Sequence, residues 1–127
     1  MLGVVGRYRS VAERLAGELA QSLKGEVEAI VLYGSVAVGE ASEDSDIDIL
    51  VVTKDRSRNL YHKISSIRTR VDLDNGTLTT LIHMSRDEFE LYLKSGSPFL
   101  EDVLRNGVAL YDGGFFKRLR ESFNKEG

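Results

Sequence analysis

Two short apolar runs separated by a small, acidic connector constrain the fold of this chain most strongly. The first run, VEAIVLYG, spans residues 27–34, and the second, DIDILVV, spans residues 46–52. Both are short and rich in β-branched residues, which indicates buried strands. The residues between them, SVAVGEASEDS (35–45), suit a connector. We therefore expect two neighbouring antiparallel strands, with residues 34–35 and Asp46 at the same end of a sheet.

Helical patterns on either side of these strands predict a mixed α/β fold. Apolar residues recur every three or four positions in several segments, and Ser85 with Glu88 forms a capping box. The expected helices span residues 4–23, 58–71, 86–94, 98–105 and 115–125. The further expected strands span residues 77–84, after a DLDNG turn at 72–76, and 107–114, at an edge. The order predicts a small mixed sheet with helices packed on at least one face.

Length and composition favour one domain over residues 1–127, since 127 residues with 42% hydrophobic content suffice for a core. The chain has no cysteine, which excludes disulfides, cysteine-based zinc sites and thiol catalysis. A net charge of -3 gives no sign of non-specific nucleic-acid binding. No apolar run is long enough for a bilayer, and the first residues turn polar too early for a signal peptide. We expect a cytoplasmic protein without membrane contact; homo-oligomerisation stays open.

The two acids at the start of the second apolar run, Asp46 and Asp48, are unusual on a core strand. Strand side chains alternate, so both carboxylates point the same way, with Cβ atoms about 7 Å apart. Alone they would repel each other and raise one pKa. Mg²⁺ prefers oxygen ligands and is often held by one or two carboxylates together with substrate phosphates. The pair therefore predicts a magnesium site.

The Gly34-Ser35 pair predicts a phosphate contact beside that metal site. Gly34 has no side chain, so its backbone can approach a phosphate closely, and Ser35 offers an amide and a hydroxyl. Either motif alone is common: an Asp-x-Asp is usually a solvated strand end, and a Gly-Ser pair is usually a turn. Their combination, strand, Gly-Ser, loop and acidic strand, is specific and points to a triphosphate bound with Mg²⁺.

The Gly-Ser pair, an eight-residue loop and DSDIDILVV together resemble the nucleotidyltransferase superfamily that includes DNA polymerase beta. The short chain is similar to the minimal members of that superfamily in archaea and bacteria. The resemblance implies that Gly34 and Ser35 hold the β- and γ-phosphates of ATP or another NTP. It also implies that Asp46 and Asp48 bind two Mg²⁺ ions, which activate an attacking hydroxyl while pyrophosphate leaves.

The chain departs from the family pattern at two positions. Many minimal members carry a basic residue shortly after Gly-Ser, where this chain has Val38. The family's third carboxylate lies on the next core strand, but TLTTLIHM (77–84) contains no acid. Thr79 or Thr80 could stand at that position. The alternative is that Asp72 or Asp74, in the turn just before the strand, supplies the third ligand.

Two functions remain open on the sequence. The first is an enzyme that transfers a nucleoside monophosphate, AMP from ATP in the leading case, to an acceptor hydroxyl. The resemblance implies a partner, because minimal nucleotidyltransferases commonly pair with a helical HEPN protein as antitoxins, and some adenylylate a tyrosine of the toxin. The second is a catalytically weakened or inactive nucleotide-binding module that controls a partner by binding. The missing third acid motivates the second reading.

Overall fold

A four-stranded mixed sheet in the order β3-β2-β1-β4 organises the protein in the computed structural model, which describes residues 3–126. The strands are β1 (Val27–Tyr33), β2 (Ile47–Thr53), β3 (Thr79–Ser85) and β4 (Val108–Asp112). β1 pairs antiparallel with both β2 and β4, and β2 pairs parallel with β3. The predicted antiparallel pairing of the two apolar runs is confirmed, and β4 is an edge strand as expected.

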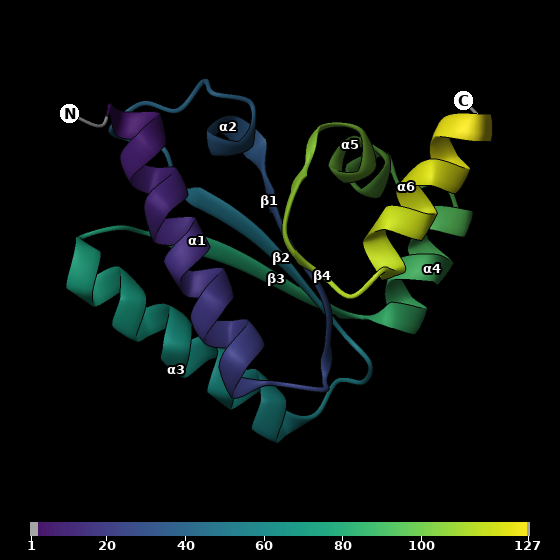
Figure 1. The fold of residues 1–127 in the computed structure, drawn as a ribbon, viewed down its shortest axis with the longest axis horizontal. Coiled ribbons are helices and arrows are strands. Elements are labelled where there is room, and N and C mark those ends of the chain that lie inside the picture. Colours follow the sequence, from purple (N-terminus) through teal and green to yellow (C-terminus); the bar gives the residue numbers. More distant parts are fainter. Residues whose placement is uncertain (1–2, 127) are drawn as a thin grey trace.

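Helices cover both faces of this sheet (Figure 1), which confirms the predicted mixed α/β class. The helices are α1 (Val4–Ser22), α2 (Gly34–Ala37), α3 (Arg58–Asn75), α4 (Arg86–Lys94), α5 (Pro98–Asn106) and α6 (Phe115–Glu126). Side chains of α1 and α3 pack into one core cluster, whereas side chains of α4, α5 and α6 pack into another. The sheet therefore separates two cores.

The alternation along β2 explains how a single strand serves both cores. Ile47, Ile49 and Val51 belong to the cluster with α1 and α3. Leu50 and Val52 belong to the cluster with α4, α5 and α6. All five side chains are buried. Successive strand residues face opposite sides, so a strand covered on both faces needs a continuous apolar run.

Local signals set most helix boundaries where the sequence predicts them. The capping box at the start of α4 is present, because the Ser85 hydroxyl accepts from the Glu88 amide and the Glu88 carboxylate accepts from the Ser85 amide. Pro98 occupies the first turn of α5, where no amide proton is needed. α1 ends at Ser22, one residue before the predicted end.

The predicted turn at residues 72–76 is wrong in its extent. α3 continues through Asn75, and only Gly76 takes a left-handed conformation, with φ of 64°. The Asn75 side chain donates to the Val71 carbonyl at 2.7 Å, and the Gly76 amide donates to the Asp72 carbonyl. These bonds satisfy the last carbonyls of the helix, so Asn-Gly closes a helix here instead of forming a hairpin turn. β3 consequently begins at Thr79, two residues later than predicted.

Candidate functional site

The Asp-x-Asp segment lies where three elements meet at one end of the sheet. Asp46 directly precedes β2, and Asp48 is its second residue. In the sheet register Asp48 stands opposite Tyr33 on β1 and opposite Thr80 on β3. Residues in register share a face, so these three side chains point to the side covered by α4, α5 and α6. α2 begins immediately after Tyr33.

Gly34 lies directly beside the Asp48 carboxylate. Its φ is +73°, a conformation that side chains rarely adopt. A Cβ atom built at this position would lie 2.3 Å from Asp48 Oδ2, much closer than two such atoms can approach. Only glycine therefore fits both the backbone turn and the space beside the carboxylate. The predicted neighbours Gly34 and Asp48 are thus brought together by the fold.

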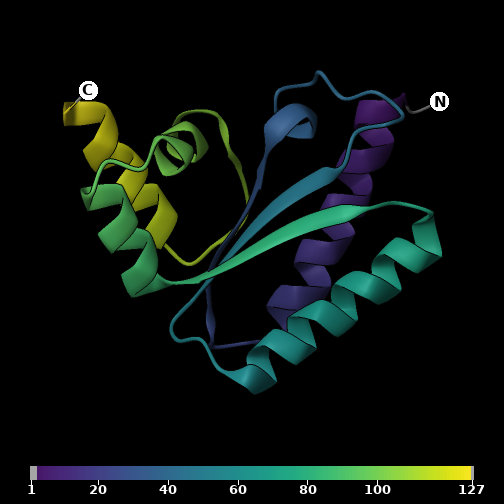
Figure 2. The ribbon, with the colours of Figure 1, turned by 180° about the vertical axis from the view of Figure 1, so that it is seen from behind.

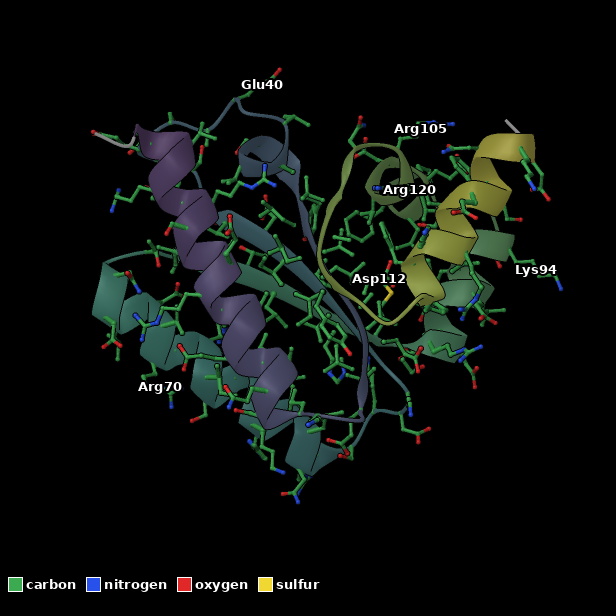
Figure 3. The ribbon with its side chains drawn as sticks, viewed as in Figure 1. Glu40, Arg70, Lys94, Arg105, Asp112 and Arg120 are labelled. Carbon is green, nitrogen blue, oxygen red and sulfur yellow. The ribbon has the colours of Figure 1, made fainter. Side chains whose placement is uncertain are left out.

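Ser35 follows in α2, at the same end of the sheet. The amides of Gly34, Ser35 and Val36 begin this helix, so they have no acceptor within it. Val36 is buried and fixes the helix on the core, whereas Ser35 is half-buried. The connector then leaves the sheet, and Glu40 points outward from it (Figure 3). Gly34 and Ser35 therefore present backbone donors beside the two acids.

The two acids differ in environment. Asp46 is exposed, and its Oδ2 accepts a hydrogen bond from Thr80 Oγ1 at 3.3 Å. Asp48 is half-buried, and burial raises its pKa, with a further contribution from the negative charge of Asp46. Burial disfavours the ionised form, and so does a like charge nearby. The protein thus holds a carboxylate pair that a cation would stabilise.

Tyr33 and Phe99 form a wall of the site that sequence reasoning missed. The Tyr33 ring contacts Phe99 of α5 edge-to-face, with centroids 5.1 Å apart. Burial raises the pKa of Tyr33 to about 12, and the charge of Asp48 adds to the effect. The position of Tyr33 directly before Gly34 was a usable signal. Phe99 carried none, because α5 reaches the site only through tertiary packing.

The candidates for a third ligand separate clearly in the fold. Thr80 lies in register with Asp48, and its hydroxyl donates to Asp46, so it lies beside both acids. Asp72 instead accepts hydrogen bonds from Thr77 Oγ1 at 2.7 Å and from the amide of Thr79 at 3.0 Å, which ties the end of α3 to β3. Asp74 pairs with Arg14 of α1 at 2.8 Å. Neither Asp72 nor Asp74 lies with Asp46 and Asp48.

The donors at the site fit a hard, oxygen-preferring cation such as Mg²⁺. Asp46 and Asp48 offer carboxylate oxygens, and Thr80 offers a hydroxyl. Within residues 3–126, no group of three or more His, Cys, Asp or Glu side chains could hold a metal ion. Two carboxylates alone suit Mg²⁺ that is bound together with substrate phosphates.

The fold and this site define a nucleotidyltransferase-type domain. A profile of the family described as "Polymerase beta, Nucleotidyltransferase" matches residues 17–113, a span that includes Gly34, Ser35, Asp46, Asp48 and Thr80. The chain belongs to this nucleotidyltransferase family. It is also 31% identical over 93 residues, 73% of this chain and 87% of the relative, to a proposed protein adenylyltransferase of Methanocaldococcus jannaschii.

Solved structures with the same fold come from toxin–antitoxin systems. A toxin–antitoxin structure with AMP-PNP matches with a TM-score of 0.59 and 22% identity, over 90% of this chain and 82% of the other. A complex of a tri-AMPylated HEPN toxin with its MNT antitoxin from Shewanella oneidensis matches with a TM-score of 0.53 and 18% identity, over 93% and 87%. At these identities the likeness establishes the fold. Among the described residues, no helix is long and apolar enough to cross a membrane.

Proposed function

We propose that this protein transfers AMP from ATP, with Mg²⁺, to a hydroxyl group on a partner protein. The observation that carries the proposal is the convergence of Gly34, Asp46 and Asp48 at one end of the sheet. Two of the similar proteins, a proposed protein adenylyltransferase and a complex that contains an AMPylated HEPN toxin, support AMP as the transferred group. They also support a HEPN-type protein as the acceptor. We propose that this acceptor is encoded beside this chain and that the two proteins meet in the cytoplasm.

Each residue has a definable task in this reaction. Asp46 and Asp48 would hold up to two Mg²⁺ ions, which neutralise phosphate charge and lower the pKa of the attacking hydroxyl. The amides of Gly34 and Ser35 would bind the β- and γ-phosphates. The acceptor hydroxyl releases its proton to solvent as its oxygen forms a bond to the α-phosphorus. The bond between that phosphorus and the pyrophosphate oxygen breaks, and pyrophosphate leaves. Tyr33 and Phe99 would limit water on the sheet side of Asp48.

A second function, nucleotide binding without efficient catalysis, is favoured by one specific observation. Thr80 stands opposite Asp48 on β3, the strand on which the resemblance places a third carboxylate. A hydroxyl neither accepts the proton of the attacking group nor adds charge to hold a second cation. In this case the protein would control its partner by binding, with ATP as a ligand.

The proposal is tested by titrating ATP calorimetrically with and without Mg²⁺ and by following AMP transfer from α-labelled ATP to the HEPN-type partner. The D46N/D48N double variant keeps the shape of both side chains and removes their charge. Asp44→Asn, an exposed acid in the same connector, is the matched control. We expect Mg²⁺-dependent binding and labelling in wild type and in D44N, and neither in the double variant.

The outcomes separate the two functions. Binding without labelling, with partner control intact in D46N/D48N, would support the binding module and overturn the enzyme. Absence of Mg²⁺-dependent ATP binding in wild type, both alone and with the partner present, would overturn both.

A further inference from the structure

A basic groove runs between α3 and the outer edge of β3, away from the Asp46–Asp48 site. Leu81 and His83 line it from the strand, and Tyr61, Ser65 and Arg68 line it from the helix. Leu81 and His83 alternate with Thr80 along β3, so their side chains lie on the opposite face of the sheet from the candidate active site. Figure 2 shows β3 as the outermost strand on this side, with α3 running beneath it.

The outer edge of β3 has backbone groups without a sheet partner. β3 is the terminal strand and pairs only with β2. The carbonyls of Thr79 and His83 point away from β2, because they accept hydrogen bonds from Arg68 and Arg56, each at 3.3 Å. Backbone directions repeat every two residues, so the amide and carbonyl of Leu81 point the same way. An unpaired edge of this kind is a template for another strand.

The charge of the groove is strongly biased. Arg56, Arg58 and Arg68 line it, and none of its lining residues in the described part of the chain is Asp or Glu. Arg56 pairs with Glu88 at 3.5 Å, but its side chain remains about half exposed. Arg58 makes no ion pair among residues 3–126. The pKa of His83 is lowered mainly by burial and further by Arg56, whereas Glu88 raises it.

α3 forms one wall of the groove beside the outer edge of β3. Ile64 and Ile67 fix this helix on the core, whereas Tyr61 is 59% exposed, one turn from Ser65. A strand added beside β3 would lie next to these outward side chains. The added strand would therefore be held by backbone bonds on one side and by side-chain contacts on one face.

We propose that this edge groove binds an extended, acidic segment of a partner protein as a fifth strand of the sheet. The segment's backbone would pair with Leu81 and His83, because Thr79 is buried and its amide already donates to Asp72. Its carboxylates would pair with Arg56, Arg58 and Arg68, so that Arg56 and Arg68 would exchange neutral carbonyl acceptors for charged ones. The unpaired backbone edge favours a peptide over nucleic acid, as does the net charge of -3. The inference is independent of the proposed transferase reaction, since it uses the opposite face of the sheet.

The test uses the full chain and a fluorescent peptide of alternating valine and glutamate, about eight residues long to match a strand. A valine–lysine peptide and a single-stranded oligouridylate serve as alternative ligands. Fluorescence anisotropy gives the affinity, and backbone NMR at up to about 1 mM peptide detects weak binding. We expect binding of the acidic peptide alone, with amide shifts centred on residues 79–83.

Two controls distinguish strand addition from simple charge attraction. Arg58→Glu should weaken binding about tenfold or more, whereas Lys63→Glu, an exposed residue of the same helix outside the groove, should leave it unchanged. Peptides N-methylated at odd or at even positions lose one set of amide donors. One of these two peptides should lose binding, because only one side of a strand faces β3.

Three results would overturn the proposal: amide shifts absent from residues 79–83 at the highest peptide concentration, equal binding of both N-methylated peptides, or preferential binding of the lysine peptide or the oligouridylate. D46N/D48N should bind the acidic peptide as wild type does. Failure here therefore leaves the transferase proposal intact, and failure of the transferase leaves this one intact.

Discussion

Replacing Gly34 with alanine tests the geometry of the candidate site most directly. Alanine in a left-handed conformation costs about 1 kcal/mol. The added Cβ would lie 2.3 Å from Asp48 Oδ2, so the carboxylate must also leave its rotamer. A forced rotamer costs about 1 kcal/mol more. We therefore expect Gly34→Ala to lower the free energy of unfolding by about 2 kcal/mol.

Gly76→Ala is the matched control for this variant. Gly76 has φ of +64° and nothing within 4 Å of a built Cβ, so it shares the backbone cost without the contact. A domain of this size loses about 3 to 5 °C in Tm per kcal/mol. We expect a loss of about 4 °C for Gly76→Ala and about 8 °C for Gly34→Ala, measured by thermal unfolding without ligand.

The same pair of variants separates stability from binding. Because Gly34→Ala displaces a carboxylate proposed to hold Mg²⁺, its Mg²⁺-dependent ATP affinity should fall about tenfold or more. Gly76→Ala should bind as wild type does. Equal melting temperatures for the two variants, together with unchanged ATP binding by Gly34→Ala, would refute the argument that Gly34 is fixed by its contact with Asp48.

Three further predictions concern other residues. Thr80→Asp adds a carboxylate opposite Asp48, so we expect a lower Tm without metal but about tenfold tighter Mg²⁺ binding by calorimetry; unchanged Mg²⁺ affinity would contradict the placement of Thr80. Asp112→Ala removes an acceptor for the amides of Gly114, Phe116 and Lys117 and should lower the free energy of unfolding in urea by about 1 kcal/mol; an unchanged free energy would contradict this role. The pKa of His83 is lowered by burial and by Arg56, so on acidification the unfolded chain takes up the proton before the folded protein does. The contribution of His83 to the free energy of unfolding is therefore full above about pH 6.5 and declines below it. His83→Gln should abolish that decline in Tm between about pH 7.5 and 5; an identical pH profile would show that the imidazole does not titrate as inferred.

Local sequence signals predicted a large part of this fold, for identifiable reasons. The apolar runs at residues 27–34 and 46–52 are short, continuous and rich in β-branched residues, as is typical of strands covered on both faces. The Ser85–Glu88 capping box and Pro98 fix helix starts through bonds made within a few residues. The turn at 72–76 failed because Asn-Gly serves both hairpins and helix ends, and only the continuation of α3 on the core decides between them.

The sequence by itself determined the chemical character of the candidate site. Gly34, Ser35, Asp46 and Asp48 carry a specific spacing, and two strands of limited length bring them together. Tertiary structure alone decided the rest. Parallel pairing of β2 with β3 sets Thr80 opposite Asp48. Asp72 and Asp74 lie away from the site, where they bond to Thr79 and Arg14. Strand register and helix packing bring together residues that are far apart in the chain, and no local sequence pattern specifies such contacts. The contact of Phe99 with Tyr33 and the open edge of β3 arise for the same reason.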